Sequence, residues 1–311
     1  MQGNILITGG AGTLGKAIIK RSVEEDWDCK ITICSTGPVK HSKALKEYPQ
    51  VNSIIGDIRD ATTVFNAMAG RDIVIHAAAV KEIPTSEWNS IDTFQINVEG
   101  SINVCNAAIS HHTPLVIGIS TDKACHPANA YGATKYLMEK SFQEYSRLGL
   151  DTRFNLVRYG NVLESSASVI EAWKRSVSEG RPIRVTDPEM TRFWISPSQA
   201  VDIVVASQRM ESGVILVSKM PSLSIGRLAE YVLEPGYEIE RIPMRAGEKM
   251  HETLLTLEEG SFAVESEDYF FLRPTTSWRN GQGNEYPILP PYSSDIAPEL
   301  TETELAELLG N

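Results

Sequence analysis

Tyr131 and Lys135 stand four residues apart in the stretch Y-G-A-T-K, a spacing that puts both side chains on one face of a helix. A nearby ammonium favours the phenolate form of a tyrosine and lowers its pKa from the usual value near ~10. The pair therefore predicts a base that removes the proton of a substrate hydroxyl group. Thr121 comes ten residues before the tyrosine, where we expect its hydroxyl to orient the same substrate oxygen.

Asp122 and Lys123 place an acid and a base side by side directly after Thr121. Such a pair in a loop is commonly a solvated surface pair. Here it follows a predicted strand and lies beside the expected base, which favours a reactive site. Eliminating water next to a newly formed ketone needs one group to remove the alpha proton and another to protonate the leaving hydroxyl. We therefore expect Asp122 and Lys123 to catalyse a dehydration.

Three glycines, Gly9, Gly12 and Gly15, follow an apolar strand-like run and open a helix-like run. The first allows a tight turn, the second lets the backbone approach a pyrophosphate, and the third lets helix and strand pack closely. Free amide groups at the start of that helix face the phosphates. The turn predicts a bound dinucleotide, and Lys135 is then placed to hold its nicotinamide ribose.

The residues after the second predicted strand indicate which dinucleotide binds. Ser35, Thr36 and Lys40 supply hydroxyls and a cation, and no acid is present to hold the ribose hydroxyls of NAD. This favours NADP, with NAD as the alternative. Asp57 ends the third strand, near the expected adenine. The residues expected to contact the cofactor, or to support those that do, are Gly9, Gly12, Thr13, Leu14, Gly15, Ser35, Thr36, Lys40, Asp57, Ile58, Ala77, Ala78, Ala79, Asn97, Tyr131 and Lys135.

Short apolar runs alternate with amphipathic runs through the first half of the chain. The expected strands are Asn4–Thr8, Ile31–Cys34, Val51–Ile55, Ile73–His76, Leu115–Ser120 and Phe154–Arg158. The expected helices between them are Leu14–Glu25, Ala61–Met68, Ile91–Ile109 and Ala130–Arg147. This alternation predicts an α/β fold, a Rossmann-type doubly wound parallel sheet. We expect a dinucleotide-binding domain over 1–160, with later strands added from the C-terminal half, and a smaller mixed substrate lobe over 161–311.

That smaller lobe is expected to be less regular. It should contain helices at Val169–Ser178, Pro197–Met210, Ile225–Val232 and Thr301–Leu309, a strand at Gly213–Val217, and a loop from about Thr275 to Pro291.

Composition excludes several other classes of protein. The net charge of −11 argues against a nucleic-acid partner. No apolar run approaches the roughly 20 residues that span a bilayer, and no signal peptide precedes the first strand. The four cysteines and six histidines show no metal-binding spacing, so we expect reduced thiols, no metal and a cytoplasmic protein.

The glycine turn together with Thr121, Tyr131 and Lys135 resembles the extended short-chain dehydrogenase/reductase superfamily. Within it, Ser120–Ala124 (S-T-D-K-A) and Y-G-A-T-K resemble the UDP-N-acetylglucosamine 4,6-dehydratases of bacterial surface-glycan pathways. Further stretches match in order: V-R-Y-G-N-V, M-T-R-F-W, A-G-E-K-M-H-E and Tyr292–Ser294. The retaining members of that family carry methionine in place of the tyrosine, so Tyr131 indicates the inverting type.

The resemblance implies a lyase that uses a UDP-N-acetyl-hexosamine, retains its cofactor and forms a homo-oligomer. It implies that a second set of residues holds the nucleotide sugar: Lys81, Asn161, Arg192, Arg245 and Glu248. The implied reaction oxidises C4, eliminates water across C5 and C6, returns hydride to C6 and inverts C5. Trp194 is expected to pack in the lobe core.

Two stretches depart from the family pattern. S-R-D-E-x-K is here Ser35–Lys40 (S-T-G-P-V-K), and G-S-R-G-S-V is here 164–169 (E-S-S-A-S-V). The first loses an arginine suited to a 2′-phosphate and the second changes a substrate loop. A UDP-sugar 4-epimerase, which has no use for Asp122 and Lys123, and a non-catalytic NADP-binding regulatory protein are the alternatives.

Overall fold

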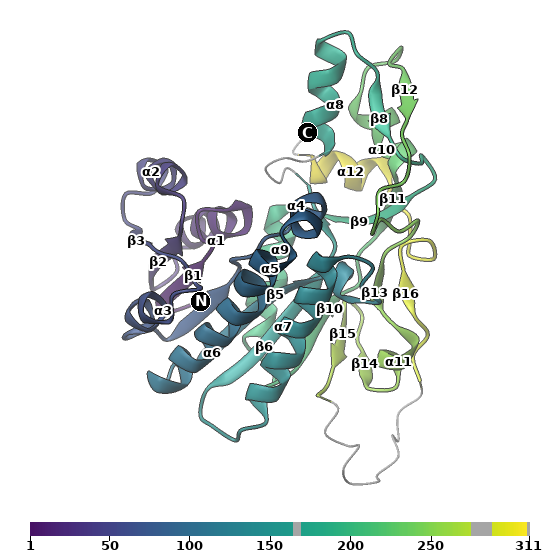
Figure 1. Ribbon diagram of the computed structural model, residues 1–311. Coiled ribbons are helices and arrows are strands. Elements are labelled where there is room, and N and C mark those ends of the chain that lie inside the picture. Colours follow the sequence, from purple (N-terminus) through teal and green to yellow (C-terminus); the bar gives the residue numbers. More distant parts are fainter. Residues whose placement is uncertain (164–168, 275–287, 310–311) are drawn as a thin grey trace.

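A nine-stranded sheet forms the centre of the molecule (Figure 1). The computed structural model describes residues 1–163, 169–274 and 288–309. The strand order is β14-β15-β10-β6-β5-β4-β1-β2-β3. The strands are β1 (Gly3–Thr8), β2 (Cys29–Ser35), β3 (Asn52–Ile55), β4 (Ile73–His76), β5 (Leu115–Thr121), β6 (Arg153–Tyr159), β10 (Ile215–Ser218), β14 (Ala263–Glu265) and β15 (Tyr269–Leu272).

The seven strands from β3 to β10 pair in parallel, while β15 and β14 add an antiparallel edge. The central strands β1, β4, β5 and β6 are largely buried on both faces because helices cover both sides. The order 3-2-1-4-5-6 of the first six strands is that of a Rossmann sheet. The predicted fold class is therefore confirmed.

Helices cover the two faces of the sheet, as Figure 1 shows. Helix α1 packs on α9, and α6 packs on both α3 and α7. The helices of this half of the molecule are α1 (Thr13–Glu24), α2 (Pro38–Glu47), α3 (Ala61–Met68), α4 (Ile83–Trp88), α5 (Ser90–Phe94), α6 (Gly100–Ser110), α7 (Ala130–Ser146) and α9 (Pro197–Ser207).

The expected helix Ile91–Ile109 is interrupted. A π-helical turn over Gln95–Glu99 separates α5 from α6. It contains Asn97, whose amide bonds the backbone N–H and C=O of Val80 at 2.9 and 3.0 Å. Helices α2 and α4 are additions to the predicted set, and each carries a proline at its first turn, a position that suits a helix start.

A second, smaller hydrophobic core lies in the C-terminal part of the chain. It gathers thirteen buried residues, among them Trp173, Trp194, Leu228 and Leu305. This lobe rises above the sheet in Figure 1. Its elements, with the short strands and helix that join it to the sheet, are β7 (Asn161–Val162), α8 (Val169–Ser178), β8 (Ile183–Val185), β9 (Thr191–Ile195), β11 (Ser222–Ser224), α10 (Ile225–Val232), β12 (Ile239–Arg241), β13 (Thr253–Leu255), α11 (Leu257–Gly260), β16 (Tyr292–Ser293) and α12 (Glu302–Leu308).

Most of the expected elements of this half are present. Strand β10 lies where a strand was expected, at Gly213–Val217, and β14 and β15 also extend the sheet. The division at residue 160 stays a prediction. The predicted loop from Thr275 to Pro291 and the departure at 164–168 lie largely outside the described residues. Within the ranges that the structure describes, no helix is long and apolar enough to cross a membrane.

Candidate functional site

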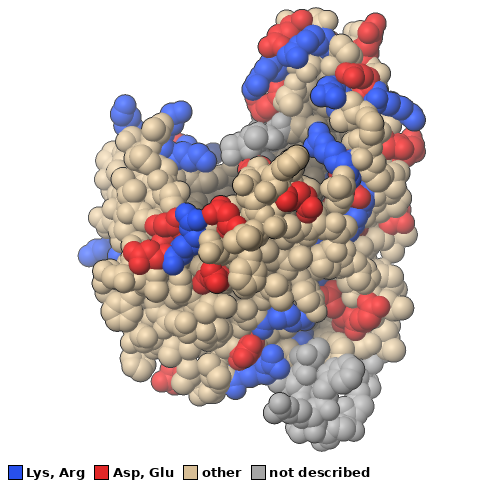
Figure 2. All heavy atoms as spheres, viewed as in Figure 1, with Lys and Arg blue, Asp and Glu red and all other residues tan. Residues whose placement is uncertain are grey.

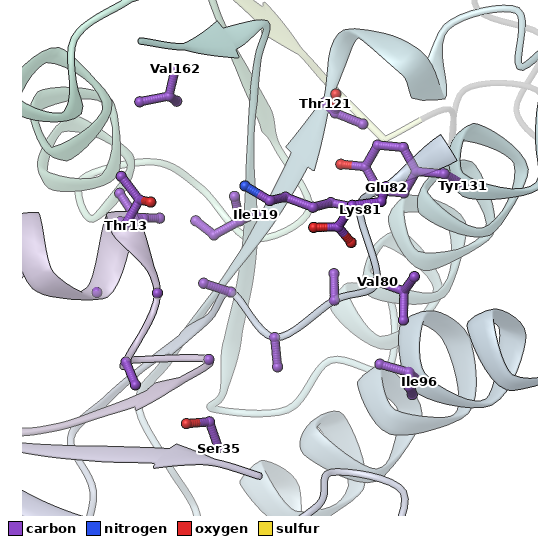
Figure 3. Close-up of a pocket in the computed structure, with 18 of the residues that line it drawn as sticks. Thr13, Ser35, Val80, Lys81, Glu82, Ile96, Ile119, Thr121, Tyr131 and Val162 are labelled. Atoms are coloured by element: carbon purple, nitrogen blue, oxygen red, sulfur yellow. The ribbon is translucent and has the colours of Figure 1, made fainter. Parts of the chain in front are cut away.

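A cleft of about 970 Å³ opens at the carboxyl ends of the central strands. The surface is hollowed there, between the α1–α2 side of the molecule and the smaller lobe (Figure 2). Figure 3 shows Thr13 and Ser35 at one side of the cleft and Thr121 and Tyr131 at the other. Ligands of open α/β sheets bind at this edge of the sheet. One cleft therefore joins the two halves of the predicted site.

The glycine turn forms one wall of the cleft. Gly9 has φ +69°, and a Cβ there would lie 2.7 Å from the backbone nitrogen of Ala78. A Cβ on Gly15 would collide with the Gly10 carbonyl, so α1 approaches β1 closely only with glycine. Gly12 is the N-cap of α1 and provides no side-chain cap, and a helix start of this kind is a site where backbone amide groups bind phosphate. These features fit a dinucleotide.

The residues after β2 and β3 lie at the far end of this wall. The Ser35 hydroxyl is within 2.6 Å of His41 Nε2 on α2, so it already has a protein partner. Thr36 and Lys40 line the cleft. The Asp57 carboxylate accepts a hydrogen bond of 2.9 Å from Arg59 Nε, and this interaction lowers the pKa of Asp57.

Tyr131 and Lys135 line the opposite end of the cleft from the first turns of α7. Asn129 caps this helix by accepting a hydrogen bond of 2.8 Å from the Gly132 N–H. The same side chain donates to the Gly247 carbonyl at 2.9 Å. The start of α7 is thus tied to the A-G-E-K-M-H-E segment.

Burial shifts the pKa values of both Tyr131 and Lys135. Burial raises the pKa of Tyr131 to about 12, and the cation that opposes this rise is Lys123. Burial lowers the pKa of Lys135 to about 7, against the charge of Glu139 one turn further along α7. Lys123 is therefore a cation that offsets part of the effect of burial on the phenol.

Thr121, Asp122 and Lys123 form a compact cluster at the end of β5. Asp122 Oδ1 accepts hydrogen bonds from the Thr121 hydroxyl at 2.6 Å and from Lys123 Nζ at 3.0 Å. Asp122 is fully buried, and its Oδ2 has no hydrogen-bond partner among the described residues. Gly160, which lines the cleft, adjoins that oxygen: a Cβ there would be 3.4 Å from it.

The residues expected to hold the nucleotide sugar divide into two groups. Lys81 and Asn161 line the cleft, and Figure 3 shows Lys81 extending across it towards Ile119. Asn161 Oδ1 accepts a hydrogen bond of 3.2 Å from Lys123. The other three residues are absent from the cleft lining: Arg192, Arg245 and Glu248.

Those three side chains have different surroundings. The Arg192 guanidinium donates to the carbonyls of Thr191, Lys249 and Met250. The Glu248 carboxylate accepts from the Arg245 N–H at 2.9 Å and so closes its own turn. Arg245 is exposed. Their contact with substrate stays a prediction.

The predicted cofactor residues also fall into two groups, because Asn97 does not line the cleft and the others do. Asn97 is buried and holds the Val80 backbone and the Thr134 hydroxyl, so it supports the wall and does not face the cleft. The remaining predicted cofactor residues line the cleft: Gly9, Gly12, Thr13, Leu14, Gly15, Ser35, Thr36, Lys40, Asp57, Ile58, Ala77, Ala78, Ala79, Tyr131 and Lys135.

Sequence reasoning missed three residues at the reacting end. Glu82 and Tyr159 line the cleft, and Glu82 lies beside Tyr131 in Figure 3. Glu252 is buried, with Oε1 3.4 Å from Lys123 Nζ. Glu252 and Tyr159 lie in A-G-E-K-M-H-E and V-R-Y-G-N-V, so the motifs contained the signal, whereas nothing in the sequence distinguishes Glu82.

Comparisons with known proteins agree with this geometry. A family described as "Polysaccharide biosynthesis protein" matches residues 5–274. The UDP-N-acetylglucosamine 4,6-dehydratase (inverting) of Campylobacter jejuni subsp. jejuni serotype O:2 is 36% identical over 99% of this chain and 97% of its own. A UDP-glucose 4-epimerase of Rickettsia massiliae is 37% identical over 86% and 81%. The X-ray structure of Pen from Bacillus thuringiensis has a TM-score of 0.90 at 30% identity and covers 100% of this chain and 97% of that one.

Proposed function

Because the chain belongs to the polysaccharide biosynthesis protein family, we propose that it is a UDP-N-acetylglucosamine 4,6-dehydratase of the inverting type, a lyase. The observation that carries this proposal is that Lys123 and Tyr131 line one end of the cleft and that Lys123 is hydrogen-bonded to the buried Asp122 behind it. An oxidation alone needs only the tyrosine and its lysine. The added acid–base pair serves an elimination.

The steps of this reaction fall to residues at the reacting end of the cleft. Tyr131 takes the proton of the C4 hydroxyl, which the Thr121 hydroxyl orients, and Lys135 holds the nicotinamide ribose. A bound nicotinamide nucleotide supplies hydride acceptance at C4 and hydride return at C6. Lys123 removes the C5 proton that the C4 ketone has made acidic. Asp122 takes up a proton on Oδ2, the oxygen without a hydrogen-bond partner among the described residues, as the substrate binds, and delivers it to the leaving C6 hydroxyl. After hydride return to C6, C5 takes up a proton on the opposite face.

We propose NADP as the cofactor, with NAD as the alternative. Helix α2 carries three exposed lysines, Lys40, Lys43 and Lys46, at the cofactor end of the cleft, and Lys40 lines it. Figure 2 shows Lys and Arg side chains at the α2 side of the hollow. A 2′-phosphate is attracted to such a site, and no carboxylate follows β2 to repel it. The UDP-N-acetyl-hexosamine then lies between Lys81, Asn161 and the smaller lobe.

We also propose that the enzyme is a homo-oligomer. Trp88 is 88% exposed and Ile91 76%, on α4 and α5, which contact α7. Phe94, Tyr136 and Leu137 add exposed apolar surface on the same helices. A second copy of the chain would cover this surface. A cytoplasmic location stays a prediction.

The oligomer has its own test. The variant Trp88→Glu with Ile91→Glu places two charges in the apolar surface, so its molar mass in light scattering should fall to that of one chain. A matched double substitution at the exposed Val23 and Ile239, which lie on α1 and β12, should leave the molar mass unchanged. A wild-type enzyme that is already a single chain at micromolar concentration contradicts the proposal.

Mass spectrometry separates the candidate reactions. Incubating the NADP-loaded enzyme with UDP-N-acetylglucosamine should give a product lighter by one water. A 4-epimerase, as the Rickettsia massiliae relative is named, gives a product of unchanged mass. A regulatory protein that binds NADP without catalysis gives no product. An unchanged mass across a range of UDP-sugars overturns the dehydratase proposal.

A further inference from the structure

Glu252 is a buried carboxylate against the proposed C5 base. It is 4% exposed, and Oε1 lies 3.4 Å from Lys123 Nζ. Glu252 lies in the C-terminal half of the chain, whereas Lys123 comes shortly after β5. The contact therefore joins two parts of the chain that are more than a hundred residues apart.

The backbone of Glu252 is held firmly in this place. Its N–H donates to the Ser294 hydroxyl at 2.9 Å, and its carbonyl accepts from the Ser294 N–H at 2.8 Å. The Ser294 hydroxyl also contacts Thr191 Oγ1 at 2.6 Å. Two-sided anchoring of one residue fixes the direction of its side chain towards Lys123.

The second carboxylate oxygen of Glu252 is a hydrogen-bond acceptor without a partner among the described residues. Oε2 is buried and makes no hydrogen bond to any described residue, although Lys249 Nζ lies 3.8 Å away. A buried acceptor of this kind costs free energy unless it is used. Lys123 faces the other oxygen, Oε1, which is therefore the one placed to take its proton.

Lys123 needs such an acceptor. Burial alone would lower its pKa, but the charges of Asp122 and Glu252 raise the pKa above its usual value, while Arg192 opposes them. The other group facing the amine is the neutral Asn161, and Tyr131 is electrostatically coupled to it. Lys123 is therefore an ammonium in the protein alone, and an ammonium cannot remove the C5 proton.

We propose that Glu252 is the positioning residue of the base: it holds Lys123 as an ammonium and then accepts its proton on Oε1, the oxygen that faces Nζ at 3.4 Å, when the substrate binds. The N–H bond of Lys123 breaks and an O–H bond forms on Glu252, which leaves a neutral amine to take the C5 proton. No oxidant or reductant is involved. This inference rests on the proposed dehydratase function.

The variant Glu252→Gln tests it, because glutamine keeps the size and hydrogen bonds of the side chain but cannot accept the proton. C4 oxidation does not need Glu252, so the absorbance of reduced nicotinamide should appear and persist after UDP-N-acetylglucosamine is added to the NADP-loaded variant. Exchange of the C5 hydrogen in deuterated water and kcat should both fall by about 100-fold, the usual scale of acid–base catalysis. KM should change little, and Glu252→Asp should recover part of the rate.

Glu265→Gln is the matched control, because it removes the carboxylate of another lysine–glutamate pair, that with Lys219 at 2.7 Å, on a different part of the surface. It should behave as wild type. If Glu252 only stabilised the ammonium, Glu252→Gln would lower the pKa of Lys123 and speed C5 exchange at neutral pH, which overturns the proposal. Loss of reduced-nicotinamide formation in the variant also overturns it, since that indicates a purely structural role. A wild-type enzyme that releases no water refutes the dehydratase function itself, and is distinguishable from both results.

Discussion

Tyr131 occupies an environment that resists ionisation. Burial raises its pKa to about 12, although Lys123 and a hydrogen bond with Thr121 act in the opposite direction. Glu82 adds negative charge on the same side and raises the pKa further. The phenol is thus protonated at neutral pH in the protein alone, and its use as a base depends on what binds in the cleft.

Replacing Tyr131 by phenylalanine keeps the ring and removes the oxygen. Because no other phenol or carboxylate is assigned to the C4 hydroxyl, product formation should fall by about 10²–10⁴-fold. NADP binding, measured by fluorescence titration, should be nearly unchanged, since the glycine turn at the other end of the cleft is intact. Activity within about tenfold of wild type contradicts the assignment.

Lys135 gives the cofactor-free protein a pH dependence of stability. Its pKa is about 7 in the fold against 10.5 for a free lysine, so between these values the unfolded chain binds more protons than the folded one. The free energy of unfolding should therefore rise with pH above about 7. Lys135→Met should reduce this rise, measured in denaturant titrations between about pH 7 and 9. The window ends at the usual pKa of cysteine, so that titration of the thiols does not dominate the slope. If the free energy of unfolding rises equally with pH in both proteins, the result contradicts the claim that burial lowers the pKa of Lys135.

The residue types of the site were predictable, but several of their partners were not. Tyr131, Lys135, Asp122 and Lys123 are recognisable because their spacing has a chemical meaning. The contact of Glu252 with Lys123 depends on the path of the chain through the smaller lobe, which no local spacing encodes. The effect of Lys135 on the phenol stays a prediction, and the burial that raises the pKa of Tyr131 and lowers that of Lys135 could not be seen in the sequence spacing.

At the scale of elements, the start of α7 has two tasks. It presents Tyr131 and Lys135 to the cleft, and through Asn129 it holds the Gly247 carbonyl of the segment that leads to Glu252. The capping bond to Gly132 N–H fixes the first turn. The Asn129 side chain therefore aligns α7, which carries Tyr131 and Lys135, with the segment that carries Glu252.

Asn129→Ala should separate stability from function. Loss of an N-cap costs about 1 kcal/mol of unfolding free energy, and Ser224→Ala, which removes the N-cap of α10, should cost a similar amount. Only Asn129→Ala should also lower kcat, because only that cap lies beside the reacting residues. Equal kcat values for the two variants at matched stability contradict the aligning role of Asn129.

Most helices and strands were predicted from the periodicity of apolar residues in the sequence, and the predictions that were wrong have physical causes. Helix α3 was predicted with its observed bounds, because Asp60 caps it and an apolar face follows. The single helix expected over Ile91–Ile109 contains instead the π-helical turn that aims Asn97 at Val80. Such turns occur frequently at functional sites, and helical periodicity does not reveal them.

At the scale of the molecule, the site depends on both parts of the chain. The Rossmann sheet supplies the glycine turn, Thr121–Lys123 and α7, while the later half supplies Asn161, Trp194 and Glu252. Sequence alone predicted the sheet and a separate smaller lobe. It could not predict that β14 and β15 return to the sheet edge, since their pairing joins residues far apart in the chain.

The most direct test of the account follows one hydrogen atom. UDP-N-acetylglucosamine carrying deuterium at C4 is turned over by the NADP-loaded enzyme, and the product is analysed by nuclear magnetic resonance and mass spectrometry. The account predicts that the deuterium is found at C6 of a product that has lost one water, and that C5 has taken up hydrogen from the solvent with inversion. Deuterium that remains at C4 in a product of unchanged composition contradicts it.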